Sequence, residues 1–75
     1  MVVKTFKLKN ITPQQALKQV MTSGIIGYLF SWGNNIDQKK NTITFTIRHG
    51  GGDGFGEEEK KVARNLEEFI KSIDV

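Results

Sequence analysis

The strongest constraint on the fold of this chain is an alternating stretch at residues 42–48, TITFTIR. Its apolar side chains, Ile43, Phe45 and Ile47, recur at every second position, with threonines between them. Successive side chains of a strand point to opposite faces, so the alternation predicts a β-strand with one buried face. The polar segment before it, residues 37–41, predicts a turn that joins it to an earlier strand as a hairpin.

A helix is predicted over residues 13–23. Thr12 is a good N-cap, Pro13 fits the first helical position, and Gln15 can complete a capping box. Gly24 follows the last turn, where a left-handed C-cap is expected. The apolar stripe of this helix consists of Ala16, Leu17, Val20 and Met21.

The remaining segments predict two more strands and a second helix. Residues 2–9 form a first strand. Residues 25–32 contribute part of a second strand, which breaks at residues 31–35 as a bulge or loop and resumes at Ile36. The alternative is a short helical turn followed by a strand near residues 34–37. Glutamates that suit the helix dipole open a last helix at residues 57–73. Its expected core stripe is Val62, Leu66, Phe69 and Ile73, with Ala63 and Ile70 beside it.

The predicted element order is β-α-β-β-α in a single domain that spans residues 1–75. A three-stranded sheet with both helices packed on one face buries every apolar stripe, so the predicted fold class is α+β. The other face of the sheet is expected to be polar and solvated. It would carry Thr5, Lys7, Thr44, Thr46 and Arg48.

Composition limits the kinds of site that this chain can hold. Its 75 residues carry a net charge of +3, no cysteine and one histidine. We therefore expect no disulfide, no structural zinc and no cofactor. No segment approaches the roughly 20 apolar residues of a membrane span. A chain this short buries only about 60% of its unfolded surface, and such domains often gain stability from a partner or a second copy.

Several features that suggest ligand sites have a simpler structural interpretation. Residues 50–56 are rich in glycine, but they lack the Lys-Ser/Thr pair of a phosphate loop, and the glutamates of residues 57–59 would repel a phosphate. We interpret them as a flexible connector. Residues 24–27 have the GXXG spacing of KH domains without a nearby basic residue, which favours a helix cap and strand start. The pattern around His49 does not indicate a catalytic arrangement with a Ser, a Cys or a patterned carboxylate, so no enzyme is predicted.

Three short motifs resemble the amino-terminal repeat domains of bacterial secretins, the outer-membrane ring channels of secretion systems and type IV pili. Residues 6–13, FKLKNITP, are similar to the family's opening strand and first helix, as are the Ala16, Leu17 and Val20 that follow. Residues 37–43, DQKKNTI, look like its aspartate, variable turn, asparagine and aliphatic strand. Residues 65–75, NLEEFIKSIDV, look like its closing helix and terminal "LDV". The resemblance spans nearly the whole chain and implies the same β-α-β-β-α order.

What the resemblance implies is a non-enzymatic, ring-building module. Such domains lie in the periplasm, pack side by side in a homo-oligomeric ring and dock other components of the secretion apparatus. A periplasmic location would apply to a domain cut from a longer exported protein, and a cytoplasmic one to a chain complete as given. Two features depart from the family: the glycine-rich segment at residues 50–56, and the long aromatic run at residues 25–32.

Two sets of contact residues follow from these hypotheses. A protein partner, either a second copy or a component of the secretion apparatus, would be met by the aromatic side chains Tyr28, Phe30, Trp32 and Phe55. The alternative function is a KH-like nucleic-acid-binding domain. Its contacts would be the basic side chains Lys7, Lys9, Lys39, Lys40 and Arg48, with Lys4 beside them.

Overall fold

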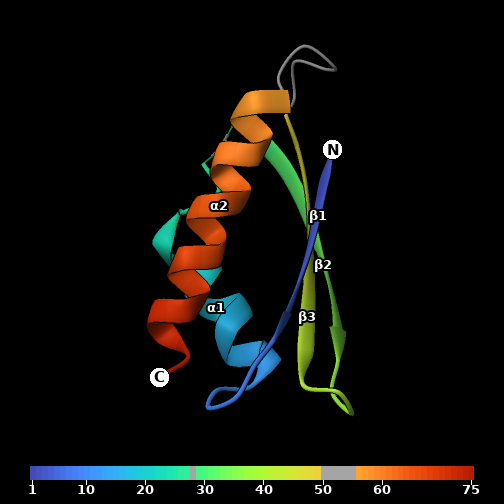
Figure 1. Cartoon of the computed structure of the whole chain (residues 1–75), viewed down its shortest axis with the longest axis vertical. Coiled ribbons are helices and arrows are strands. Elements are labelled where there is room, and N and C mark those ends of the chain that lie inside the picture. The colour runs from blue at the N-terminus through green and yellow to red at the C-terminus, as the bar shows by residue number, and fades with distance from the viewer. Residues whose placement is uncertain (28, 50–55) are drawn as a thin grey trace.

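The computed structural model describes residues 1–27, 29–49 and 56–75, and it has the predicted β-α-β-β-α order (Figure 1). Its elements are β1 (Val2–Lys7), α1 (Pro13–Ser23), β2 (Phe30–Asp37), β3 (Thr42–His49) and α2 (Gly56–Ile73). The strands form one antiparallel sheet in the order β1-β3-β2, and both helices lie on the same face of it (Figure 1). The α+β fold class predicted from the sequence is confirmed.

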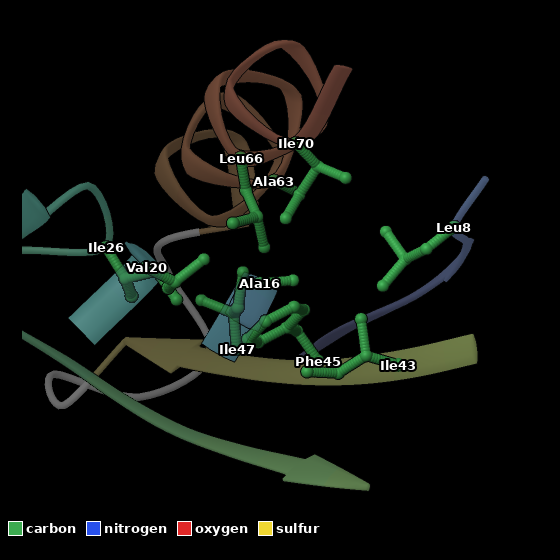
Figure 2. Close-up of a cluster of buried hydrophobic side chains, with 10 residues drawn as sticks. All are labelled: Leu8, Ala16, Val20, Ile26, Ile43, Phe45, Ile47, Ala63, Leu66 and Ile70. Carbon is green, nitrogen blue, oxygen red and sulfur yellow. The ribbon is translucent and has the colours of Figure 1, made fainter. Parts of the chain in front are cut away.

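The core is built on the central strand, β3. Ile43, Phe45 and Ile47 are fully buried, as their alternation predicts. Figure 2 shows them beneath side chains of α2, with Ala16 and Val20 of α1 beside them. Burying one such large apolar side chain stabilises a fold by roughly 1.5–3 kcal/mol. The alternating stretch is therefore the surface on which both helices pack.

Local signals define both ends of α1. The Thr12 hydroxyl accepts a hydrogen bond from the Gln15 N–H at 3.1 Å, and the Gln15 side chain accepts one from the Thr12 N–H at 2.9 Å. Gly24 ends the helix with a φ of 67°, in the left-handed region that favours glycine. The predicted capping box and C-cap are both confirmed.

The predicted second strand overlaps the observed one, but the break expected at residues 31–35 is wrong. Residues 24–27 form a turn, in which the Gly27 N–H donates to the Gly24 carbonyl at 3.1 Å. β2 begins only at Phe30 and runs through residues 31–35 without a break, in continuous register with β3. Glycine and asparagine are poor strand formers, but pairing with a well-formed central strand overrides that local preference. The alternative of a turn followed by a later strand was nearer to the structure.

The predicted helix stripes are also shifted. Met21 is 64% exposed, although its spacing placed it in the core. On α2 the buried positions are Ala63, Leu66 and Ile70, and the predicted Val62, Phe69 and Ile73 are only partly buried. Each helix packs over only part of a three-stranded sheet, so the face that it buries depends on how it is rotated about its axis. Spacing alone does not determine that rotation.

Two side chains from distant parts of the sequence hold the connection between β1 and α1. The Asn41 amide donates to the carbonyls of Leu8 at 2.9 Å and Ile11 at 3.3 Å. The Asp74 carboxylate accepts hydrogen bonds of 2.7–3.2 Å from the three N–H groups of residues 9–11. These backbone donors hold the pKa of Asp74 below its usual value, because they stabilise the charged form. With its N–H groups bonded there, the chain leaves the sheet after Lys7, two residues earlier than predicted.

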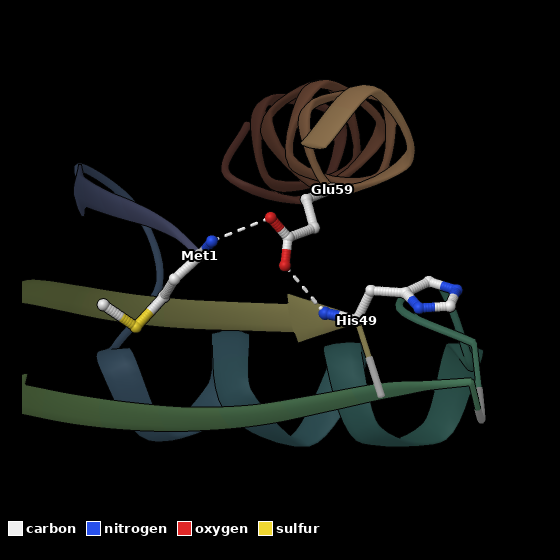
Figure 3. A network of polar contacts seen from close by, with 3 residues as sticks. All are labelled: Met1, His49 and Glu59. Atoms are coloured by element: carbon white, nitrogen blue, oxygen red, sulfur yellow. Dashed lines mark hydrogen bonds and ion pairs between the residues drawn. The ribbon is translucent and has the colours of Figure 1, made fainter. Parts of the chain in front are cut away.

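A buried carboxylate joins three elements at the other end of the sheet. Glu59 is only 5% exposed, and it lies between the amino group of Met1 and the end of β3 (Figure 3). One carboxylate oxygen is 2.8 Å from the Met1 amino nitrogen, and the other accepts a hydrogen bond of 2.8 Å from the His49 N–H. The amino-group contact and then the His49 N–H lower the pKa of Glu59. Its place in the sequence indicated only a favourable interaction with the helix dipole.

Candidate functional site

The sheet has two edge strands, β1 and β2, with which no further strand of the described residues pairs. The Leu8 N–H donates to the Asn41 carbonyl at 2.9 Å, which fixes the alternation of this antiparallel ladder. The backbone N–H and C=O groups of the even-numbered residues of β1 therefore bond to β3, and those of residues 3, 5 and 7 face outward. By the same alternation, the backbone N–H and C=O groups of the even-numbered residues of β2 face away from β3. Such backbone groups are natural association surfaces.

Two of the four predicted aromatic contacts lie on β2. Phe30 and Trp32 are half-buried and point to the helix side of the sheet. The Phe30 ring packs edge-on against His49 at 5.1 Å, and the Trp32 ring lies 5.8 Å from Phe45. Both side chains therefore contribute to the core and leave only part of each ring available for a partner.

An open groove of about 410 Å³ lies beside β2, at the end of α1. We call it the β2 groove, and no charged side chain lines it. Its walls are Val20, Met21, Gly24, Ile26, Gly27 and Trp32. Met21 is 64% exposed, and Leu29, just before β2, is 58% exposed. Of these two side chains Met21 lines the groove, and exposed apolar surface in a groove marks a surface suited to binding.

The other two predicted contacts, Tyr28 and Phe55, lie outside the described residues, as do residues 50–55 of the glycine-rich segment. The second isoleucine of the GXXG spacing, Ile26, is 3% exposed and belongs to the core. This pattern therefore serves the cap of α1 and the packing behind it.

The structure separates the predicted nucleic-acid contacts into two places. Lys7 pairs with Thr42 in the ladder, so it lies at the end of the sheet that carries the turn with Lys39 and Lys40. Lys9 is also at this end. Arg48 is at the opposite end of β3, roughly 20 Å from Thr42 at about 3.3 Å per residue. The five side chains do not form one surface.

Apart from Val3, the sheet face opposite the helices is polar, as predicted. Thr5, Lys7 and Arg48 are exposed on it, and Thr44 and Thr46 are half-exposed. The hydroxyls of Thr5 and Thr44 are 2.9 Å apart across the two strands. These threonines satisfy one another's hydrogen-bonding groups and leave the charges at the margins of the face.

A second groove runs along β1, between this edge strand and α2. We call it the β1 groove. Its two sections hold about 480 Å³ and about 350 Å³, and Glu67 lines both. Six basic residues line it: Lys4, Lys7, Lys9, Lys60, Arg64 and Lys71. The three from α2 were not predicted as contact residues, because only packing places that helix beside β1.

Neither a metal centre nor a membrane span is found in the part of the chain that the structure describes. No three His, Asp or Glu side chains are grouped there in a way that could hold a metal ion. No described helix combines the length and the apolar character needed to cross a bilayer.

The fold and these surfaces define a small α+β domain with two free sheet edges, each with a groove beside it. Comparison of the chain with protein-family models, curated proteins and solved structures finds no match.

Proposed function

We propose that this chain is a non-enzymatic protein–protein interaction module that associates with copies of itself through the β2 edge and the β2 groove. The observation that carries the proposal is the position of an uncharged groove directly beside a free strand edge. The edge offers backbone hydrogen bonds, and the groove offers apolar surface to bury.

A second copy is the partner that fits this surface best. Two β2 grooves can meet without burying any charge, since no charged side chain lines them. A contact of this kind is self-complementary and gives a two-fold dimer. By contrast, the β1 side carries six cations, so two β1 sides would repel each other. Pairing β2 of one copy with β1 of the next would place cations beside an uncharged groove, where they would have no partner of opposite charge.

The resemblance to secretin repeat domains supports the same class of function. Asn41 and Asp74 belong to two of the three resembling motifs, and their side chains hold residues 9–11, which belong to the other. This contact gives a structural reason for the three motifs to occur together. On this basis we propose a secretin-repeat type of module, which would be periplasmic as part of a longer exported protein. A ring would need a head-to-tail contact in place of the two-fold one.

Sedimentation velocity over a range of concentrations tests self-association. We expect Met21→Lys to weaken it about tenfold or more, because the ammonium group would be buried without a partner. The matched control is Gln19→Lys, which adds the same charge to an exposed position of α1 outside the β2 groove. A wild-type protein that stays monomeric at the highest concentration contradicts the proposal, and so does equal weakening by both variants. The size of the assembly distinguishes a dimer from a ring.

A further inference from the structure

The β1 groove concentrates positive charge on one side of the molecule. Six of the eleven lysines and arginines in the chain line it. Lys60, Arg64 and Lys71 belong to α2. Lys4 and Lys7 belong to β1, and Lys9 follows that strand by two residues. α2 runs alongside β1 (Figure 1), and basic residues of both elements line the groove between them.

The carboxylates in the β1 groove are already engaged. Glu67 is 3.6 Å from Lys71 of its own helix. Asp74 accepts hydrogen bonds from three backbone N–H groups, so its charge is compensated by the backbone. No contact within 4 Å pairs Lys4, Lys60 or Arg64 with a described carboxylate. The groove is therefore suited to a ligand that brings its own negative charge.

The free edge of β1 adds a second recognition element. The N–H and C=O groups of Val3, Thr5 and Lys7 face away from β3, along the groove. An extended peptide can bond to this edge as a fourth strand, which is how many domains recognise peptide segments. Its side chains would alternate between the two sheet faces, and those on the helix side would point toward Lys60 and Arg64.

We propose that the β1 groove binds an extended acidic segment of a partner protein, which joins the sheet beside β1 with its carboxylates facing the cations of α2. This surface is separate from the β2 groove and does not depend on self-association. A single-stranded nucleic acid would also meet positive charge here, but its bases would find few aromatic side chains on which to stack. Of the aromatic side chains described, only Phe6 lines the groove, and it is half-buried at 6.2 Å from Phe45.

Fluorescence anisotropy with a labelled peptide tests the proposal. The peptide alternates glutamate with threonine over about eight residues, enough to span β1 at about 3.3 Å per residue. A glutamine-for-glutamate peptide tests the need for charge, and an oligothymidine single strand tests the nucleic-acid alternative. We expect saturable binding of the acidic peptide that weakens with added salt, and binding at least about tenfold weaker for the other two probes.

Adjacent lysines of α2 provide a matched pair of variants. Lys60 lines the β1 groove, whereas Lys61 does not, and both are exposed. We expect Lys60→Glu to weaken binding of the acidic peptide about tenfold, and Lys61→Glu to have a much smaller effect. Circular dichroism confirms that each variant is folded. Equal effects from the two substitutions would show that binding depends on net charge alone and would overturn the proposal.

Val3→Pro tests whether the peptide pairs with the strand. Val3 is 55% exposed, and its N–H faces outward, so proline removes a donor from the edge without breaking the ladder to β3. Val3→Ala keeps that N–H. We expect the proline variant to lose binding of the acidic peptide and the alanine variant to retain it. Retained binding by a folded proline variant would overturn strand addition.

Two further results would assign the groove to another occupant and overturn the proposal. One is tighter binding of oligothymidine than of the acidic peptide. The other is a pair of observations: Lys60→Glu loses self-association, and the wild-type protein releases the peptide at concentrations that favour self-association. Together they would place a second copy in the groove. Self-association can fail in Met21→Lys while peptide binding persists, so the two proposals are tested separately.

Discussion

Asn41 combines an unusual backbone conformation with a bridging side chain. Its φ is 54°, in the left-handed region, which asparagine tolerates better than most residues. Its amide group bonds to two carbonyls of the connection that leads into α1. The turn of the β2–β3 hairpin is therefore joined to the first third of the chain by one side chain.

Substitution of Asn41 can separate these two roles. Asn41→Gly keeps the left-handed backbone but removes the amide, and we expect it to lower the free energy of unfolding by about 1–3 kcal/mol. Asn41→Ala loses the amide and adds backbone strain of roughly 1–2 kcal/mol. Urea denaturation of the three proteins measures both effects. Equal stability of the glycine and alanine variants would show that the backbone conformation contributes nothing.

Asp74 gives the fold a dependence on acid pH. Its pKa is lowered in the folded state, first by the N–H of Asn10 and then by that of Lys9. A carboxyl group with a depressed pKa contributes stability that is complete above its unfolded pKa of about 3.9 and is lost as the pH falls through the lower native value. Its charged form is therefore what holds residues 9–11.

We expect Asp74→Asn to lower the unfolding temperature at neutral pH. The difference from wild type should stay constant down to about pH 4 and shrink below it, because the unfolded chain takes up the proton first, and the loss is complete once the native carboxyl group is protonated. Glu59, whose pKa is also lowered, is present in both proteins and does not affect the difference. Thermal melts between neutral and acid pH measure it. Glu68→Gln, at an exposed position of α2, is the control and should show no such trend.

The C-cap of α1 illustrates how one backbone conformation ends a helix. Gly24 has a φ of 67°, and a Cβ atom built there meets nothing within 4 Å. Gly56, the first residue of α2, has equally open surroundings and is not at positive φ. The two glycines therefore differ in conformation and not in available space.

We expect Gly24→Ala to lower the free energy of unfolding by about 1–2 kcal/mol, because alanine resists the left-handed conformation. Gly56→Ala should leave it unchanged or raise it by up to about 1 kcal/mol, since alanine is the better helix former. Chemical denaturation of both variants provides the comparison. A Gly24→Ala protein as stable as wild type would mean that the end of α1 relaxes at no cost.

The sequence predicted the elements best where local signals agree with packing. The alternation at residues 42–48 and the capping box of α1 are both confirmed. β2 was misplaced because its polar middle, residues 33–35, forms a strand only through hydrogen bonds supplied by β3. The face that α2 buries was misjudged by about one position, since it depends on contacts with β1 and β3 that are distant in sequence.

The candidate surfaces could be predicted only in part. Phe30 and Trp32 were expected near a contact surface, and Trp32 does line the β2 groove. Lys7 and Lys9 were expected on a basic surface, but their neighbours in the structure are cations of α2. Such neighbours come from the docking of a helix beside an edge strand. No periodicity in the chain reveals that arrangement.

The two sides of the molecule differ in chemistry, which has a consequence for its assembly. The β2 side is uncharged where it is grooved, and the β1 side is strongly basic. One domain can therefore present two surfaces that select different partners. The same difference opposes uncontrolled edge-to-edge growth, because cations beside an edge strand discourage further copies from adding to it.

The sheet order β1-β3-β2 also determines when the parts of the fold can form. β2 and β3 are joined by a short turn, so their pairing closes a small loop and can occur within microseconds. β1 has to wait for β3, whose partner positions lie about forty residues further along the chain, and closing that larger loop costs more chain entropy. During synthesis, the first strand to emerge is thus the last to find its place in the sheet. We expect its lysines to disfavour association with other chains during that interval, because charged residues beside a strand oppose aggregation.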